Sequence, residues 1–179
     1  MELSQEKAQI AYVLLWSQMK NGRLHFSDIF DIRFRKRIMR NILGRNQSVF
    51  DSDEEYQKLF ERHVLEQAVG YPKPLLQSDE DFTRIAESKV YAQVLGREKR
   101  VFEDMSQFRN EAYIKALEKA SGLKKQPQES SARFIRRAKP AAWQKETGVK
   151  KLILESDDHV VERAKKELTR MILKNNNFQ

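Results

Sequence analysis

The chain has 179 residues, of which 40% are hydrophobic and 34% charged, and it contains six glycines, four prolines and no cysteine. This composition predicts a helical chain with a modest core, and it excludes disulfides and any metal or iron–sulfur site built on cysteine. No run of eighteen apolar residues and no signal-peptide pattern occurs, so we expect a cytoplasmic protein without a membrane partner.

The net charge of +8 comes from one segment. Residues 1–121 carry 20 Lys/Arg and 19 Asp/Glu, residues 122–151 carry 9 and 2, and residues 152–179 carry 5 of each. A short basic segment in a nearly neutral chain indicates a polyanionic or acidic partner.

Five helices are predicted before the basic segment. The first two cover about 4–20 and 27–43, because each begins at a capping serine and continues with an apolar stripe of period 3.6. The third and fourth begin at Ser52 and Ser78, where the acids that follow favour a helix start over a calcium loop. The fifth is expected over about 97–120, with an apolar side formed by Val101, Met105, Phe108, Ala112 and Leu117.

The segment "YPKPLL" between the third and fourth helices contains two prolines, which disfavour a helix. We expect an extended crossover in which Tyr71 and either Leu75 or Leu76 pack on the core.

Three helix openings resemble one another: "SVFDSDEE", "PLLQSDED" and "LILESDDH". Their capping serines are Ser52, Ser78 and Ser156, and the two intervals differ in length. We interpret them as three helix starts with the same capping chemistry, and a diverged internal repeat is the alternative.

After residue 122 the pattern changes. We expect a flexible linker, then one or two helical turns at "ARFIRRA", a short strand or extended piece at 149–154, and a last helix that begins at Ser156. The predicted fold is therefore an all-α bundle of five or six helices with a basic, partly extended C-terminal arm and a terminal helix. The predicted domains are a helical core (1–121), a basic linker or arm (122–155) and a C-terminal helix with a frayed tail (156–179).

Catalytic motifs are absent from the sequence. There is no glycine-rich phosphate loop and no nucleophile elbow, and His25, His63 and His159 lie far apart without a metal-binding spacing. We therefore expect no enzymatic activity, no metal and no cofactor. A cleft that gathers His63 or His159 with several carboxylates would favour an enzyme instead.

The basic segment supplies the main candidate site. Its arginines suit phosphate, and its two aromatic rings suit unpaired bases. The same rings are alternatively anchors in the protein core or contacts for a protein partner. The candidate residues are Arg133, Phe134, Arg136, Arg137, Lys139, Trp143, Lys145, Lys150 and Lys151.

A second basic stripe is predicted on the helix over 27–43 and just after it. Such a stripe suits a helix that lies along phosphates. Alternatively, its charge is offset by acids of the third helix. The stripe consists of Arg33, Lys36, Arg37, Arg40 and Arg45.

The expected function is non-enzymatic binding of DNA or RNA with low sequence specificity, within a larger nucleic-acid-processing complex. The alternative is a helical adaptor or assembly subunit whose basic arm docks on an acidic protein.

Overall fold

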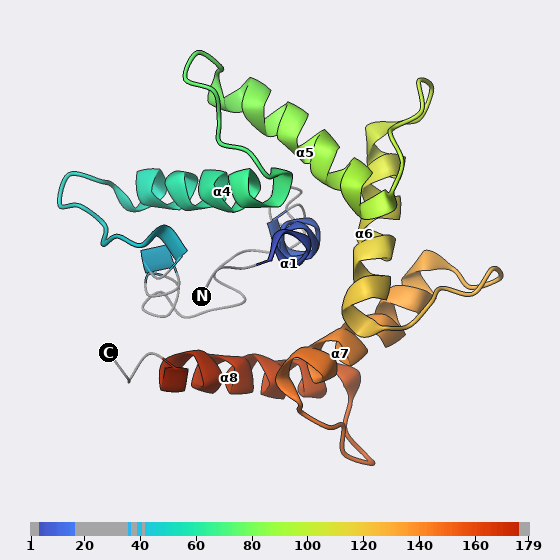
Figure 1. The fold of residues 1–179 in the computed structure, drawn as a ribbon. Coiled ribbons are helices and arrows are strands. Elements are labelled where there is room, and N and C mark those ends of the chain that lie inside the picture. Colours follow the sequence, from blue (N-terminus) through green and yellow to red (C-terminus); the bar gives the residue numbers. More distant parts are fainter. Residues whose placement is uncertain (1–3, 17–35, 37–38, 41, 176–179) are drawn as a thin grey trace. The chain divides into compact units, whose positions relative to one another are not determined.

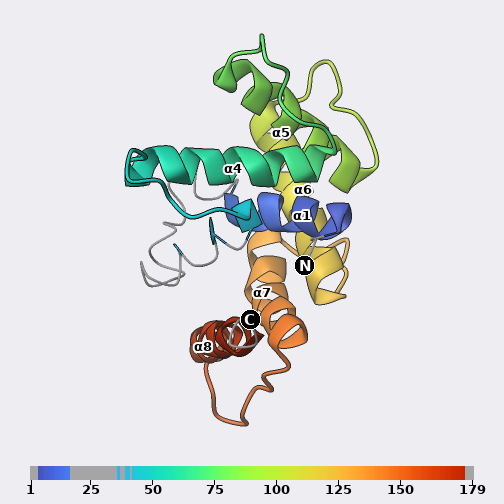
Figure 2. The same cartoon turned by 60° about the vertical axis from the view of Figure 1, so that its left-hand side comes forward.

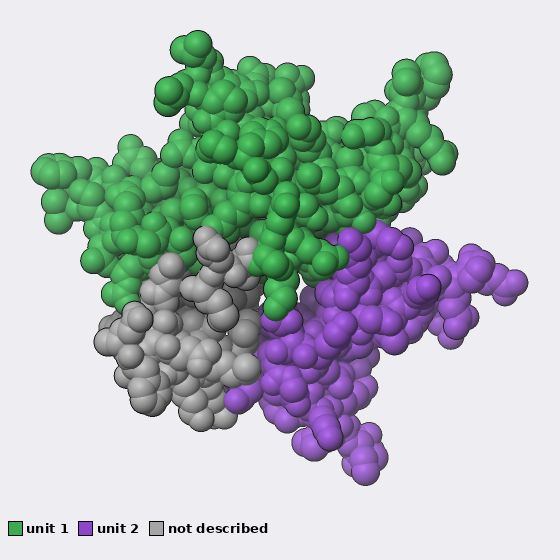
Figure 3. All heavy atoms as spheres, viewed as in Figure 1, with its two compact units in different colours: residues 1–112 green, residues 113–179 purple. Residues whose placement is uncertain are grey.

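The computed structural model describes residues 4–16, 36, 39–40 and 42–175 (Figure 1). These residues form six α-helices and one π-helical turn and contain no strand, which confirms the all-α prediction. The chain divides into two compact units, residues 1–112 (unit 1) and residues 113–179 (unit 2), shown in Figure 3.

Five helices follow one another at a constant interval. They are α4 (Asp53–Val69), α5 (Asp79–Leu95), α6 (Met105–Ser121), α7 (Ser131–Thr147) and α8 (Asp157–Asn175). Each helix begins 26 residues after the one before it, and the first four have 17 residues each. The 78 residues between Ser78 and Ser156 are three such intervals. The interpretation of the three openings as unrelated helix starts was therefore wrong, because this part of the chain is a tandem repeat.

The ends of the helices repeat with the same period. A glycine in the left-handed conformation follows each helix from α4 to α7, where a side chain would be strained. The residue that precedes each helix is a serine or, for α6, Asp104. At α4 a capping box is present, since Ser52 Oγ accepts from the Glu55 N–H and the Glu55 carboxylate accepts from the Ser52 N–H. These glycines are Gly70, Gly96, Gly122 and Gly148, and Gly44 has the same conformation one interval before Gly70.

The core repeats as well. Counting each capping residue as position 1, position 5 holds a large apolar residue that is at most 2% exposed in all five repeats. Position 9 is also buried and is alanine in the last four repeats. The residues at position 5 are Tyr56, Phe82, Phe108, Phe134 and Val160, and those at position 9 are Phe60, Ala86, Ala112, Ala138 and Ala164.

The N-terminal helix α1 (Gln5–Ala11) begins at the capping Ser4 and continues into the π-helical turn η1 (Tyr12–Trp16). It packs against α4 and α5 in unit 1 (Figure 2). The buried Gln9 joins the three helices, because its Nε2 donates to the Ala68 carbonyl at 3.2 Å and to Gln93 Oε1 at 3.0 Å. This side chain is a satisfied polar anchor.

The loops between the helices end in a tight turn at the same repeat positions. In each loop the N–H of position 26 donates to the carbonyl of position 23, and position 26 is an acid in four of the five loops. The acid's carboxylate accepts in return from the N–H of position 23. In the remaining loop position 23 is Pro74, which has no N–H, and position 26 is Gln77. The turns close from Asp51, Gln77, Glu103, Glu129 and Glu155 to Ser48, Pro74, Arg100, Gln126 and Leu152.

Two expectations about these loops were wrong. Leu75 and Leu76 are fully exposed at the tip of their turn, although Tyr71 does pack on the core with its ring edge against Phe82. The fifth helix begins at Met105 instead of near residue 97, and Val101 is 88% exposed in the preceding loop. Asp104 caps this helix, since its Oδ2 accepts from the Ser106 N–H at 2.9 Å.

The basic segment also differs from its prediction. Instead of a linker with one or two helical turns, residues 131–147 form the complete helix α7, which begins after the capping Ser130. The helix continues through the buried Pro140, although proline costs about 3 kcal/mol relative to alanine in a helix interior. Residues 149–154 form no strand and contain the fifth tight turn.

Candidate polyanion-binding surface

The two units differ in net charge. Unit 1 contains 18 Lys/Arg and 18 Asp/Glu, whereas unit 2 contains 16 Lys/Arg and 8 Asp/Glu. The net charge of the protein therefore belongs to unit 2, and its surface is the candidate site for a polyanion.

Helix α7 carries a basic exposed stripe. Arg133, Arg136 and Lys139 follow one another at intervals of three residues, and Trp143 lies four residues further on. The three basic side chains are exposed and Trp143 is partly buried. We call these four residues the α7 stripe. Its basic groups are accessible to a ligand, and part of the Trp143 side chain is accessible as well.

The first turn of α7 adds to this positive potential. Acids occupy the first turns of α4, α5 and α8, where they match the positive end of the helix dipole. The first turn of α7 contains no acid and includes Arg133 instead. An external anion can therefore meet both the helix terminus and the arginine.

Phe134 is not part of the accessible surface. Its ring is 0% exposed at position 5 of the repeat, with the Arg137 guanidinium 5.1 Å from the ring centroid. A fully buried ring cannot stack on a base, so its assignment to a nucleic-acid contact is corrected: Phe134 is an anchor in the core of unit 2. This was the alternative that the sequence left open.

Arg137 is also engaged within the protein. Its Nε and Nη2 donate to the two oxygens of Glu129 at 2.7 and 2.8 Å, and Nη2 also donates to the Lys124 carbonyl at 2.7 Å. The hydrogen bonds from Arg137 lower the pKa of Glu129 to about 2. Because the guanidinium fork is occupied by this carboxylate, Arg137 supports a loop and is not a free phosphate ligand.

The same arrangement occurs one repeat later. Arg163 donates to both oxygens of Glu155 at 2.7 and 2.6 Å and to the Lys150 carbonyl at 2.7 Å. We call this arrangement of arginine, carboxylate and carbonyl the loop clamp. The clamp was missed in the sequence, although Arg137 and Arg163, like Glu129 and Glu155, are 26 residues apart.

The remaining candidates of unit 2 lie towards the C-terminal end of α7 and in the loop that follows. Lys145, Lys150 and Lys151 are exposed, and Lys151 Nζ is 2.6 Å from Asp157 Oδ1. Exposed pairs of this kind contribute little and dissociate readily. These lysines are therefore available to a ligand but lie further along the chain than the α7 stripe.

The second basic stripe is only partly described. Arg33 and Arg37 lie outside the described residues. Lys36 Nζ is 2.9 Å from Asp53 Oδ1 at the start of α4, and Arg45 Nη1 is 3.1 Å from Asp51 Oδ2. Each of these two cations therefore has an acidic partner at or just before the third predicted helix, although exposed pairs of this kind contribute little. Arg40 is exposed.

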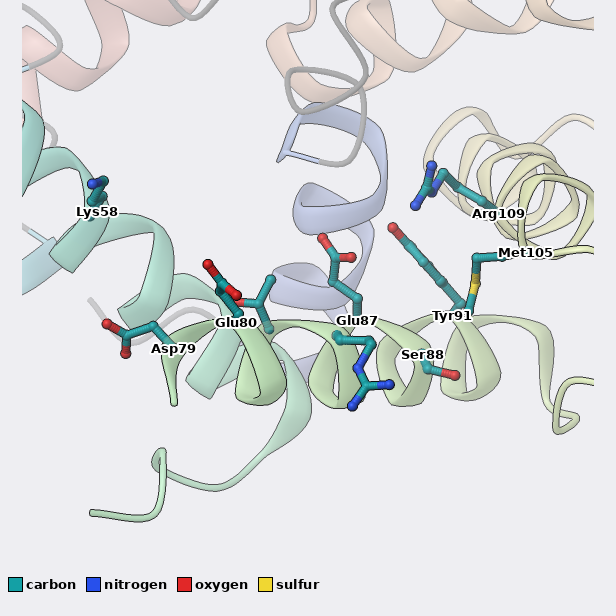
Figure 4. Close-up of a pocket in the computed structure, with 10 residues that line it drawn as sticks. Lys58, Asp79, Glu80, Glu87, Ser88, Tyr91, Met105 and Arg109 are labelled. Atoms are coloured by element: carbon teal, nitrogen blue, oxygen red, sulfur yellow. The ribbon is translucent and has the colours of Figure 1, made fainter. Parts of the chain in front are cut away.

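Unit 1 contains an open depression of about 650 Å³ along α5 (Figure 4). Glu87, Tyr91 and Arg109 line it together with residues of α4 and α6. Tyr12 donates a hydrogen bond to Glu87 from outside this lining, and burial followed by the Glu87 charge raises the pKa of Tyr12 well above its usual value. Tyr12 therefore acts as a hydrogen-bond donor and is not a base at neutral pH.

The histidines that would favour an enzyme are not part of this depression. His63 contacts Gln67, with 3.0 Å between their Nε2 atoms, and His159 Nδ1 is 2.8 Å from Glu155 Oε1. His25 lies outside the described residues. Across the described ranges, no group of three or more His, Asp or Glu side chains could hold a metal ion.

Comparisons with protein families, with curated proteins and with solved structures find no match for this chain. Among the described helices, none is both long enough and apolar enough to cross a membrane.

Proposed function

We propose that the protein binds nucleic acid without enzymatic activity and with low sequence specificity, and that unit 2 is the contact surface. The observation that carries the proposal is the concentration of the whole net charge in unit 2, with Arg133, Arg136 and Lys139 exposed on one helix. Each basic side chain that meets a phosphate releases a condensed counterion, so such a surface binds without reading bases.

The composition of the stripe favours single strands. Trp143 keeps part of its surface accessible beside basic residues, and aromatic side chains beside basic ones are where unpaired bases stack. The sequence pattern does not resemble a helix-turn-helix reading head, which agrees with contacts to the backbone instead of to base edges.

The test is fluorescence anisotropy with a labelled single-stranded RNA, a single-stranded DNA and a DNA duplex over a series of salt concentrations. The native chain is expected to bind more weakly as salt rises. In the variant Arg133→Gln/Arg136→Gln/Lys139→Gln, the slope of log K against log salt should become shallower by about 2 to 3.

The matched control is Lys7→Gln/Lys58→Gln/Arg84→Gln, which removes the same charge from exposed positions of unit 1. It should leave the salt slope within error of the native value. The proposal fails if the native chain binds none of the three nucleic acids at low salt, or if both triple variants change the slope equally.

A protein adaptor is the second candidate, and the same stripe provides its support. Tryptophan and arginine are the side chains most enriched among residues that dominate protein interfaces, and Trp143 shares its face of α7 with Arg136. An adaptor would bind a defined acidic protein with little salt dependence and would lose it on Trp143→Ala. Absence of nucleic-acid binding together with such a partner would favour this function.

A further inference from the structure

The loop of unit 2 between α7 and α8 ends in three exposed apolar residues. Leu152 is 61% exposed, and Ile153 and Leu154 are 101% and 98% exposed. Lys150 and Lys151 come directly before them. We call residues 152–154 the apolar tip. Isolated apolar residues on a surface are common, but three consecutive ones at the end of a projecting loop indicate a contact site.

Hydrogen bonds at the base of the loop fix the conformation of the apolar tip. The Leu152 N–H donates to Glu155 Oε2 at 3.0 Å, and the Glu155 N–H donates to the Leu152 carbonyl at 3.1 Å. The loop clamp of Arg163 then binds the same carboxylate and the Lys150 carbonyl. The polar groups that close the turn at Leu152 and Glu155 are thus paired within the protein.

The preceding loop of unit 2 is a natural comparison. It has the same turn and the same clamp, formed by Glu129, Arg137 and the Lys124 carbonyl. Its tip, however, is Gln126, Pro127 and Gln128. The frame is therefore compatible with a polar tip, so the apolar residues at 152–154 are not required by the fold.

We propose that the apolar tip inserts into the surface of a lipid bilayer containing anionic lipids. The side chains of Ile153 and Leu154 are fully exposed and that of Leu152 is 61% exposed, and fluid acyl chains accept such a projection without a preformed pocket. Glu155, directly after the tip, is paired with Arg163, and the exposed pair of Lys151 with Asp157 carries no net charge. Unit 2, with 16 Lys/Arg and 8 Asp/Glu, is attracted to negatively charged headgroups.

The apolar tip differs from the other exposed apolar pairs in its length and in the net charge of the unit that carries it. Unit 1 presents Val49–Phe50, Leu75–Leu76 and Val101–Phe102 at the equivalent positions, each pair almost fully exposed. Those pairs belong to a unit with equal numbers of basic and acidic residues. Only the tip at 152–154 combines three apolar residues with a net positive unit.

The test exchanges the two tips of unit 2 in the full chain and measures binding by co-sedimentation. The vesicles contain phosphatidylcholine and phosphatidylserine in a ratio of about 7:3, with pure phosphatidylcholine as the neutral arm. The variant Leu152→Gln/Ile153→Pro/Leu154→Gln should lower the partition coefficient by about tenfold or more. Adding Gln126→Leu/Pro127→Ile/Gln128→Leu to that variant should restore most of the binding, because the second loop has the same frame.

A label provides an independent readout, since the chain contains no cysteine. A polarity-sensitive fluorophore attached to Ile153→Cys should show a blue-shifted emission with the anionic vesicles. The same label at Pro127→Cys should not. Soluble glycerophosphoserine should compete with neither signal, which separates a bilayer from an isolated headgroup.

The proposal is overturned if the native chain does not bind the vesicles, or if the polar tip leaves the partition coefficient unchanged. It is also overturned if the tip exchange alters a concentration-dependent molar mass without lipid, because the tip would then contact a second copy of the chain. Nucleic-acid binding is tested separately by Arg133→Gln/Arg136→Gln/Lys139→Gln, so either proposal can fail alone.

Discussion

At the scale of single residues, the acids that close the loops are the most informative side chains. Hydrogen bonds from Arg97, Arg137 and Arg163 respectively lower the pKa values of Glu103, Glu129 and Glu155 to about 2, below the usual 4.5. A carboxyl group whose pKa is lower in the folded state stabilises the fold above its unfolded pKa and loses this effect as the pH falls. The three groups therefore stabilise the fold at neutral pH and lose that contribution between about pH 4.5 and 2.

Glu155→Gln tests this effect. The variant should be less stable than the native chain at pH 7, and the difference should disappear as the pH approaches 2, where the native carboxyl becomes protonated. Urea unfolding at a series of pH values measures it. Glu146→Gln, at an exposed position of α7, is the control and should follow the native curve. A constant difference between Glu155→Gln and the native chain at every pH would contradict the assignment.

The sequence identified residues in local interactions more reliably than residues whose role depends on burial. Capping serines and their acids were predicted, because a cap is a local interaction within four residues. The burial of Phe134 was left open, because an aromatic residue beside two arginines has the same composition in a core and in a binding surface. Val101 and one of Leu75 and Leu76 were assigned to the core because they are apolar. The turns that expose Leu75 and Val101 depend on Gln77 and Glu103, each two residues later.

At the scale of elements, the repeat was visible in the sequence and was not recognised. Five of the six glycines lie at intervals of 26 residues, which is a stronger signal than the three serine openings. The number of helices could be predicted because each helix has its own apolar stripe. The boundaries of α6 and the extent of α7 were wrong, because Asp104 was not considered as a cap and Pro140 was taken as an interruption.

Since each repeat contributes one helix and one loop in a fixed register, insertion of a complete repeat should be tolerated. A chain in which 123–148 is duplicated in tandem should gain about one helix in circular dichroism and retain a cooperative urea transition. Duplication of only the first half, 123–135, should broaden or abolish the transition, because it breaks the spacing between glycine and capping residue. Equal behaviour of the two duplications would argue against a structural repeat.

At the scale of the whole molecule, the two units predict a graded response to core substitutions. Phe134→Ala and Phe82→Ala remove equivalent buried rings from unit 2 and unit 1, and each should cost about 3–5 kcal/mol. In native-state hydrogen exchange, Phe134→Ala should lower protection mainly in α7 and α8, and Phe82→Ala mainly in α4 and α5. A uniform loss of protection throughout the chain in both variants would show that the units unfold together.

The loop clamp has one further consequence. The clamp joins an arginine of the following helix to a carboxylate and a carbonyl that flank the turn. It uses no side chain from the two residues at the centre of the turn, which are Pro127–Gln128 in one loop and Ile153–Leu154 in the other. A mutation at a tip can therefore change what the protein touches while the helices keep their register. In such a chain, surfaces can diverge one loop at a time, and a new contact does not require a new fold.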